Sequence, residues 1–151
     1  MPHDLVLVRQ LKASPENLYR CWTDAELLKQ FFTPRPGVTA EAAIDPVPGG
    51  RFYTKMVFDD LGAFPQEGCI LVADPGRRLA FTDCLSAGFR PKTGGFFTAD
   101  ITFTAKDGGC EYRVTARHAD AETMRKHAEM GFENGWGATS AQLDAVALSL
   151  G

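Results

Sequence analysis

Three titratable residues occur at positions where the sequence predicts that their side chains face an apolar interior. Asp83 follows Phe81, and His118 follows Ala116, at alternate positions of predicted strands, while His127 lies on a predicted helix. Burying such groups costs free energy unless they are paired. A carboxylate and a histidine that open into an apolar cavity could orient a ligand or transfer a proton. The alternative is that Asp83 and His118 lie at strand ends, where they are hydrated or cap neighbouring backbone.

Acid–base catalysis would need two of these groups within hydrogen-bond reach of each other. A cyclase, dehydratase or hydrolase would use His118 or His127 with Asp83, or would use Tyr112 as a proton donor. The sequence contains no GxSxG or HExxH motif and no glycine-rich phosphate loop. These three residues and Tyr112 are therefore the catalytic candidates, and no specific spacing supports them.

The cysteines give no sign of a metal site. None of them forms a CxxC pair, and no histidine lies near enough in sequence to complete a zinc knuckle. We therefore predict no metal and no cofactor. The cysteines are expected to be buried free thiols in a reducing compartment; they are Cys21, Cys69, Cys84 and Cys110.

Composition limits the classes of partner. The chain has 151 residues, of which 44% are hydrophobic and 23% charged, as is typical of a globular domain. Its net charge of −3 gives no electrostatic reason to expect nucleic acid or an anionic membrane. No apolar run approaches the ~20 residues of a membrane span, and no signal peptide is visible, so we expect a cytoplasmic location. The 11 phenylalanines favour a bulky core or an aromatic-lined pocket.

The elements that position the candidates follow from periodicity and turn residues. Ser14-Pro15 predicts the start of one short helix, Thr23-Asp24 the start of a second, and Asp120 the start of a long helix that reaches about Leu148. Short turns join the later strands, so the sheet should be antiparallel and should need a helix to cover its apolar face. Strands are predicted over residues 4–11, 38–44, 51–58, 65–73, 78–85, 96–105 and 110–118.

The side chains that face the inside of this sheet are mostly aromatic. Alternation predicts that five of them line the concave face: Phe52, Met56, Phe81, Phe97 and Tyr112. The long helix carries small residues at near-helical spacing, which indicate either close packing or a void. These residues are Gly131, Gly135 and Ala138.

An ordered set of motifs resembles a known family. The motifs are Arg9, Ser14-Pro-Glu-x-x-Tyr-x-x-Trp22-Thr-Asp24, Leu28-x-x-Phe31-Phe32, Pro48-Gly49-Gly50-Arg51-Phe52, Gly68 through Asp74-Pro75-x-x-x-Leu79-x-Phe81-Thr82, and His127-x-x-Met130-Gly131-Phe132-x-x-Gly135-Trp136 followed by Leu143. Over nearly the whole chain they resemble the START-related helix-grip superfamily called SRPBCC, in the branch related to the activator of the heat-shock-protein-90 ATPase. One departure is Phe31, where the family often has tryptophan.

The resemblance implies one α+β helix-grip domain over residues 1–151. A curved antiparallel sheet of about six to seven strands would wrap around a long C-terminal helix, with two short helices between the first and second strands. Members of the superfamily bind lipids, sterols, polyketides, hormones or other apolar molecules in a deep cavity, and a few are cyclases or hydrolases. The predicted ligand-binding residues are Trp22, Phe31, Phe52, Met56, Phe81, Asp83, Phe97, Tyr112, His118, Met130, Gly131 and Trp136.

Three functional hypotheses follow. The first is a carrier, sensor or sequestering protein for a small hydrophobic molecule, which a cavity filled by Trp22, Phe81 and Trp136 themselves would contradict. The second is an enzyme of polyketide cyclase-like type that acts in the same cavity. The third is a chaperone-activator-like interaction domain. A homodimer is a further hypothesis, because aromatic side chains exposed at the surface would favour one; the candidates are Phe32, Phe89 and Phe96.

Overall fold

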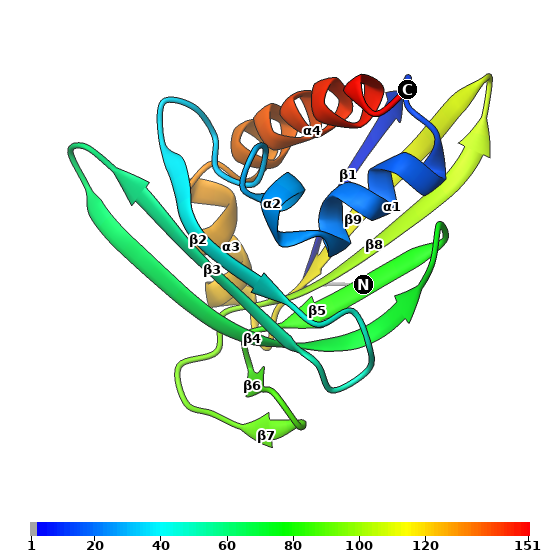
Figure 1. Ribbon diagram of the computed structural model, residues 1–151. Coiled ribbons are helices and arrows are strands. Elements are labelled where there is room, and N and C mark those ends of the chain that lie inside the picture. The colour runs from blue at the N-terminus through cyan, green and yellow to red at the C-terminus, as the bar shows by residue number, and fades with distance from the viewer. Residues whose placement is uncertain (1–2) are drawn as a thin grey trace.

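The chain folds into a curved antiparallel sheet with helices inside its curve (Figure 1). The structure is a computed structural model and describes residues 3–151. Seven strands pair in the order β1-β9-β8-β5-β4-β3-β2, and β6 and β7 form a separate small hairpin. The strands are β1 Asp4–Leu11, β2 Val38–Ile44, β3 Arg51–Phe58, β4 Gly62–Asp74, β5 Arg78–Thr82, β6 Leu85–Ser86, β7 Arg90–Pro91, β8 Thr98–Lys106 and β9 Gly109–Arg117.

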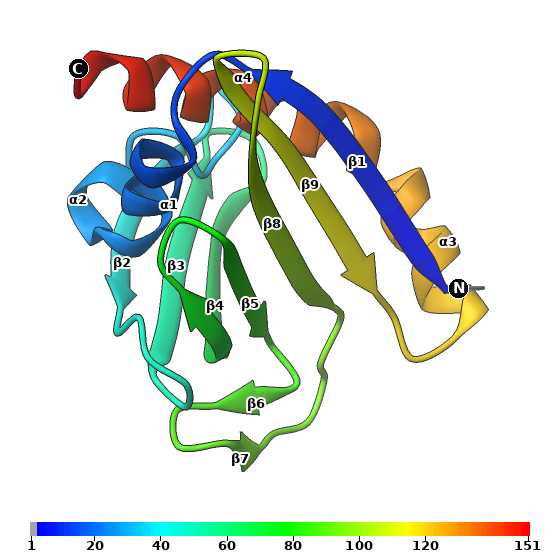
Figure 2. The ribbon, with the colours of Figure 1, turned by 90° about the vertical axis from the view of Figure 1, so that its right-hand side faces the viewer.

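Four helices accompany the sheet. Two short ones lie between β1 and β2, α3 packs beside β1 (Figure 2), and α4 lies across the open side of the sheet. This arrangement confirms the predicted α+β fold with its seven-stranded antiparallel sheet. The helices are α1 Pro15–Thr23, α2 Ala25–Leu28, α3 Ala121–Glu129 and α4 Phe132–Ser149.

The predicted caps start the first two helices. The Ser14 hydroxyl accepts a hydrogen bond from the Asn17 amide at 3.1 Å, and Pro15 occupies the first helical turn. The Asp24 carboxylate accepts hydrogen bonds from the amides of Glu26 and Leu27. The buried residues of α1 include Leu18 and Trp22, which belong to the core.

One continuous C-terminal helix was predicted from the sequence. The structure instead has two helices, with a break at Gly131. This glycine has φ of +94°, which ends α3 and directs the chain into α4 at a new angle. Its amide donates to the Ala128 carbonyl at 3.1 Å, which closes the last turn of α3. The Asp120 carboxylate caps α3 by accepting from the Thr123 amide at 2.8 Å. Gly131 is thus a hinge between two helices rather than a small residue in the middle of one.

Two other expectations need correction. Cys21, Cys69 and Cys110 are buried free thiols as predicted, but Cys84 is exposed. The reason is that β5 ends at Thr82, so Cys84 lies in the connection to β6 and not in a strand. Part of the predicted polar loop over residues 86–95 instead forms the β6–β7 hairpin.

No helix among residues 3–151 combines the length and the apolar character that crossing a bilayer requires.

The hinge predicts opposite effects for two alanine substitutions. A Cβ added at Gly131 or at Gly135 would meet no atom within 4 Å, so the two positions differ only in backbone conformation. Gly131→Ala should lower the free energy of unfolding by about 1 kcal/mol, because alanine disfavours positive φ. Gly135→Ala should raise it by about 0.5–1 kcal/mol, because Gly135 lies within α4. Urea denaturation of both variants tests this, and a stabilised Gly131→Ala protein would contradict the hinge.

Candidate functional site

A pocket of about 360 Å³ lies between the concave face of the sheet and the helices. Its lining is predominantly aromatic, with a few polar side chains. Phe64 and Met130 are strongly exposed and mark its mouth. The lining residues are Trp22, Phe31, Phe32, Pro34, Phe52, Thr54, Met56, Phe64, Gln66, Gly68, Phe81, Thr82, Asp83, Phe96, Phe97, His127, Met130, Gly131, Phe132, Gly135, Trp136 and Thr139.

Trp22 lies at the centre of the aromatic wall. Its ring centroid is 5.1 Å from that of Phe31 and 6.1 Å from that of Trp136, and the latter pair is stacked. Phe52 and Phe81, from β3 and β5, stack at 4.1 Å. α1 therefore supplies one side of the wall, and the sheet and α4 supply the others.

The structure brings most of the predicted ligand-binding residues to this pocket. Every residue of that predicted set lines it except Tyr112 and His118. Tyr112 is almost fully buried behind the wall, where its hydroxyl accepts a hydrogen bond from Trp22 Nε1 at 3.2 Å. Burial raises the pKa of Tyr112, although the hydrogen bond from Trp22 acts in the opposite direction. Tyr112 therefore supports the wall and does not face the cavity.

Asp83 lines the pocket, but neighbouring groups of the protein occupy its carboxylate. Oδ1 accepts from the amides of Phe96 at 2.7 Å and Phe97 at 3.1 Å, and Oδ2 accepts from Gln66 Nε2 at 2.6 Å. Asp83 follows the end of β5, and these hydrogen bonds hold the chain that leads into β8 against it. This is the capping role that the sequence analysis gave as the alternative to catalysis.

The two buried histidines contact each other. His118 Nε2 lies 2.8 Å from His127 Nδ1, and His118 Nδ1 lies 2.8 Å from the His3 carbonyl. Three phenylalanine rings surround the His127 imidazole at centroid distances of 4.8–5.1 Å. This burial, together with the neighbouring His118, lowers the pKa of His127 to about 4. His127 is therefore uncharged at neutral pH and lines the pocket as a polar but neutral group.

Asp83 does not join the histidines. Its hydrogen bonds go to backbone amides and to Gln66, and those of the histidines go to each other and to His3. The predicted pairing of Asp83 with a histidine is therefore absent from the hydrogen bonds of residues 3–151. Within that range, no cluster of three His, Cys, Asp or Glu side chains could hold a metal ion.

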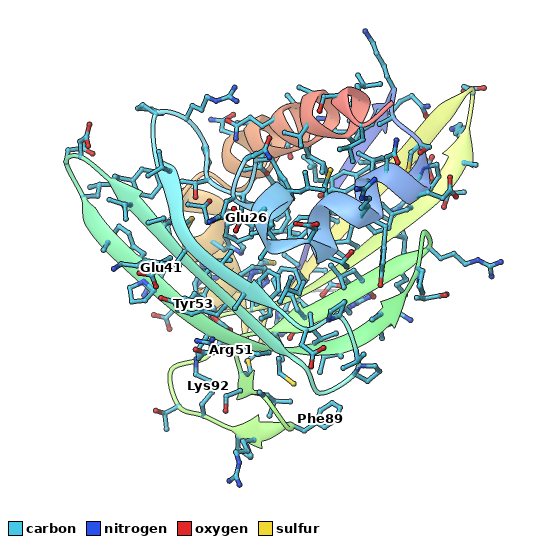
Figure 3. The ribbon with its side chains drawn as sticks, viewed as in Figure 1. Glu26, Glu41, Arg51, Tyr53, Phe89 and Lys92 are labelled. Carbon is cyan, nitrogen blue, oxygen red and sulfur yellow. The ribbon has the colours of Figure 1, made fainter. Side chains whose placement is uncertain are left out.

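Several residues lie in positions that differ from those predicted from the sequence. Phe32 and Phe96 were expected at the surface, but both are half-buried and line the pocket. Phe89 is exposed, and it projects from the β6–β7 hairpin on the side of the sheet away from α4 (Figure 3). Ala138 was expected to share one helix face with Gly135, facing either close packing or a void, but it is exposed, because the lining face of α4 continues to Thr139 instead.

Several lining residues were missing from the predicted ligand-binding set. Phe132 precedes Trp136 by four positions and Thr139 by seven, and this helical spacing was a signal for one face of α4. Thr54 lies between Phe52 and Met56, and strand alternation places it on the same face as these two residues.

A sequence profile described as Activator of Hsp90 ATPase homolog 1-like protein matches residues 12–147. A crystal structure of a protein from Nitrosomonas europaea is 35% identical, with a TM-score of 0.93 and coverage of 97% of this chain and 94% of that one. A protein from Mycobacterium smegmatis, 24% identical, superposes with a TM-score of 0.78 over 96% of this chain and 90% of that one. An AHSA1-like protein from Aeromonas hydrophila, 16% identical, gives 0.73 over 97% and 93%. No curated protein matches the sequence.

The buried histidine predicts a loss of stability in acid. Because the pKa of His127 is about 4 in the folded chain and near 6.5 when unfolded, the unfolded chain binds an extra proton between these values. Stability should therefore fall as the pH is lowered, by about 2 kcal/mol between pH 7.5 and pH 5 from this residue. His127→Asn should show a shallower decline, since asparagine does not titrate. Urea midpoints at both pH values test this, and equal declines in both proteins would contradict it.

Proposed function

The chain belongs to the Activator of Hsp90 ATPase homolog 1-like family, and we propose that it binds a small hydrophobic ligand in the pocket between its sheet and α3–α4. The observation that carries this proposal is the unfilled volume of about 360 Å³ inside an aromatic wall. Ligand sites are typically apolar concavities of about 300–1,000 Å³ with a few placed polar groups. The volume lies at the small end of that range, so the ligand should be a compact molecule.

The aromatic side chains narrow the pocket without filling it. Trp22 contacts both Phe81 and Trp136, at centroid distances of 5.8 and 6.1 Å, and these rings form one side of the space. On the α4 side, Gly131 and Gly135 contribute no side-chain volume, and a Cβ at either would lie in open space. This combination of packed rings and empty glycine positions supports a binding role over a collapsed core.

A reaction in the same pocket is a second candidate, because His118 and His127 are hydrogen-bonded and His127 lines the cavity. It ranks second for two reasons. A histidine with a pKa of about 4 is a weak general base at neutral pH. The carboxylate of Asp83 already accepts three hydrogen bonds from amide groups, so it is engaged in holding the fold.

Native mass spectrometry of the freshly isolated protein, followed by denaturing extraction, tests the proposal directly. A defined apolar molecule at near-stoichiometric amount would support it and would identify the compound to test for turnover. Both tryptophans of the chain line the pocket, so energy transfer from them to the neutral dye N-phenyl-1-naphthylamine gives an independent measure of binding. A protein that carries no ligand and does not bind the dye would refute the proposal.

Two leucine substitutions on α4 provide a matched test of the location. Gly135→Leu places a side chain in the open space of the pocket and should weaken dye binding at least about 10-fold. Ala138→Leu adds a similar volume at an exposed position of the same helix and should change binding by less than about 2-fold. Fluorescence titration of both variants, with circular dichroism to establish folding, measures the difference. Equal binding by the two variants would place the dye elsewhere.

A further inference from the structure

We propose that the pocket selects hydroxylated aromatic ligands, because His127 presents an unprotonated Nε2 that can only accept a hydrogen bond. This inference rests on the proposed function and adds the direction of the polar contact that a ligand must make. It follows from assigning a donor and an acceptor to each hydrogen bond along a chain of three groups, from the His3 carbonyl through His118 to His127.

The His3 carbonyl determines which nitrogen of the His118 ring carries the hydrogen. A carbonyl oxygen can only accept, so His118 Nδ1, at 2.8 Å from it, must carry the hydrogen and donate. A neutral imidazole has one N–H and one acceptor nitrogen, so in the neutral form of His118 the acceptor is Nε2. The position of the proton on His118 is thus set by a backbone carbonyl that immediately precedes β1.

The second ring follows from the first. His118 Nε2 lies 2.8 Å from His127 Nδ1, so His127 Nδ1 must carry the hydrogen and donate to it. His127 Nε2 is then the acceptor nitrogen of that ring. Burial among phenylalanine rings favours the uncharged form of His127 that this assignment requires.

His127 Nε2 is available to a ligand. Among the described residues, no protein group hydrogen-bonds to this atom, and it is not one of the fully enclosed side-chain atoms that lack a partner. His127 is a lining residue of the pocket, and we assign its accessible nitrogen to the pocket side of the ring. A molecule with a hydroxyl group could satisfy it, whereas one with an ether or a ketone would leave two acceptors facing each other.

Two other polar side chains of the pocket, Asp83 and Thr54, discriminate less between donors and acceptors. The Asp83 oxygens already accept from Phe96, Phe97 and Gln66. The Thr54 hydroxyl has no hydrogen bond within residues 3–151, but a hydroxyl can donate or accept and so discriminates little. With the aromatic wall selecting flat apolar molecules, the fixed acceptor makes a phenol-like compound the chemical class that matches best.

The proton positions can be measured without a ligand. In ¹⁵N-labelled protein at pH 8, two-bond ¹H–¹⁵N correlation spectra distinguish the two imidazole tautomers. Both His118 and His127 should be protonated at Nδ1, which is the minor tautomer of free histidine in water. A His127 ring protonated at Nε2 would overturn the inference, whatever the binding experiments show.

Ligand preference tests the consequence with two matched probes, 2-naphthol and 2-methoxynaphthalene. The intact protein should bind 2-naphthol about 10-fold more tightly, as expected for one hydrogen bond to an otherwise unpaired buried acceptor. His127→Asn retains a donor near the position of Nδ1 but removes Nε2, so the preference should fall to about 2-fold or less. Ala138→Leu, which changes an exposed position of α4 and leaves both histidines unchanged, serves as the control and should keep the preference.

His118 is a positioning residue in this scheme, because it acts on the ligand through His127. His118→Leu should leave the pocket lining intact but free the His127 ring to adopt either tautomer. The preference for 2-naphthol should then decrease, and the Nδ1-protonated signal of His127 should weaken. A purely structural role would alter the affinity for both probes equally.

The outcomes separate this inference from the proposed function. Equal affinity of the intact protein for both probes would refute the selectivity and leave the hydrophobic binding site standing. Binding of neither probe, together with no binding of the dye, would refute the proposed function, and the inferred selectivity with it. A preference that survives in His127→Asn would assign the acceptor to a different group and overturn the role of His127.

Discussion

The indole of Trp22 lies where α1, the sheet and α4 meet, and five aromatic rings pack around it. Such a ring contributes a large apolar area, but its N–H must find an acceptor when it is buried. The hydroxyl of Tyr112 provides that acceptor from β9. The pair thus connects α1 to the strand that lies next to the edge strand β1. Tyr112 lies behind the ring of Trp22, and the pocket lies on the side of that ring that faces Trp136 and Phe81.

The pocket exists because the helical side of the structure carries glycines where the sheet carries large aromatic side chains. Phe52 and Phe81 project from the sheet, and Gly131 and Gly135 lie on the helices without side chains that could meet them. The hinge at Gly131 adds to this effect, since its positive φ turns α3 away from the line of α4. A straight helix over the same residues would place its side chains differently along the sheet. Backbone conformation and side-chain size together keep this space open.

Periodicity was sufficient to predict the sheet, the early helices and most of the wall, because these depend on local alternation and on caps such as Ser14. The hinge could not be read in the same way: a glycine within a helical pattern is compatible with a packed helix, a void or a break, and only the observed φ decides. Phe96 and Phe97 illustrate a second limit. Adjacent residues of a strand face opposite sides, yet both rings line the pocket because β8 begins only at Thr98. Turn residues and caps gave the order of elements, and the resemblance to the family supplied the helix-grip arrangement, whereas these details depend on tertiary context.

Buried polar groups show why sequence pattern alone could not separate structure from function. Asp83 and His127 were both predicted at inward-facing positions, and both line the pocket. The acceptors of Asp83 are met by amide groups of the protein, so its burial is explained by the fold. His127 is different, because its partner is a second histidine whose own proton is fixed by a backbone carbonyl, and this leaves one nitrogen without a protein partner in the described chain. A ligand that covers this nitrogen and excludes water must donate to it, because an acceptor left unpaired in an apolar site costs free energy. That cost is the physical reason to assign a ligand contact to His127 and a structural role to Asp83.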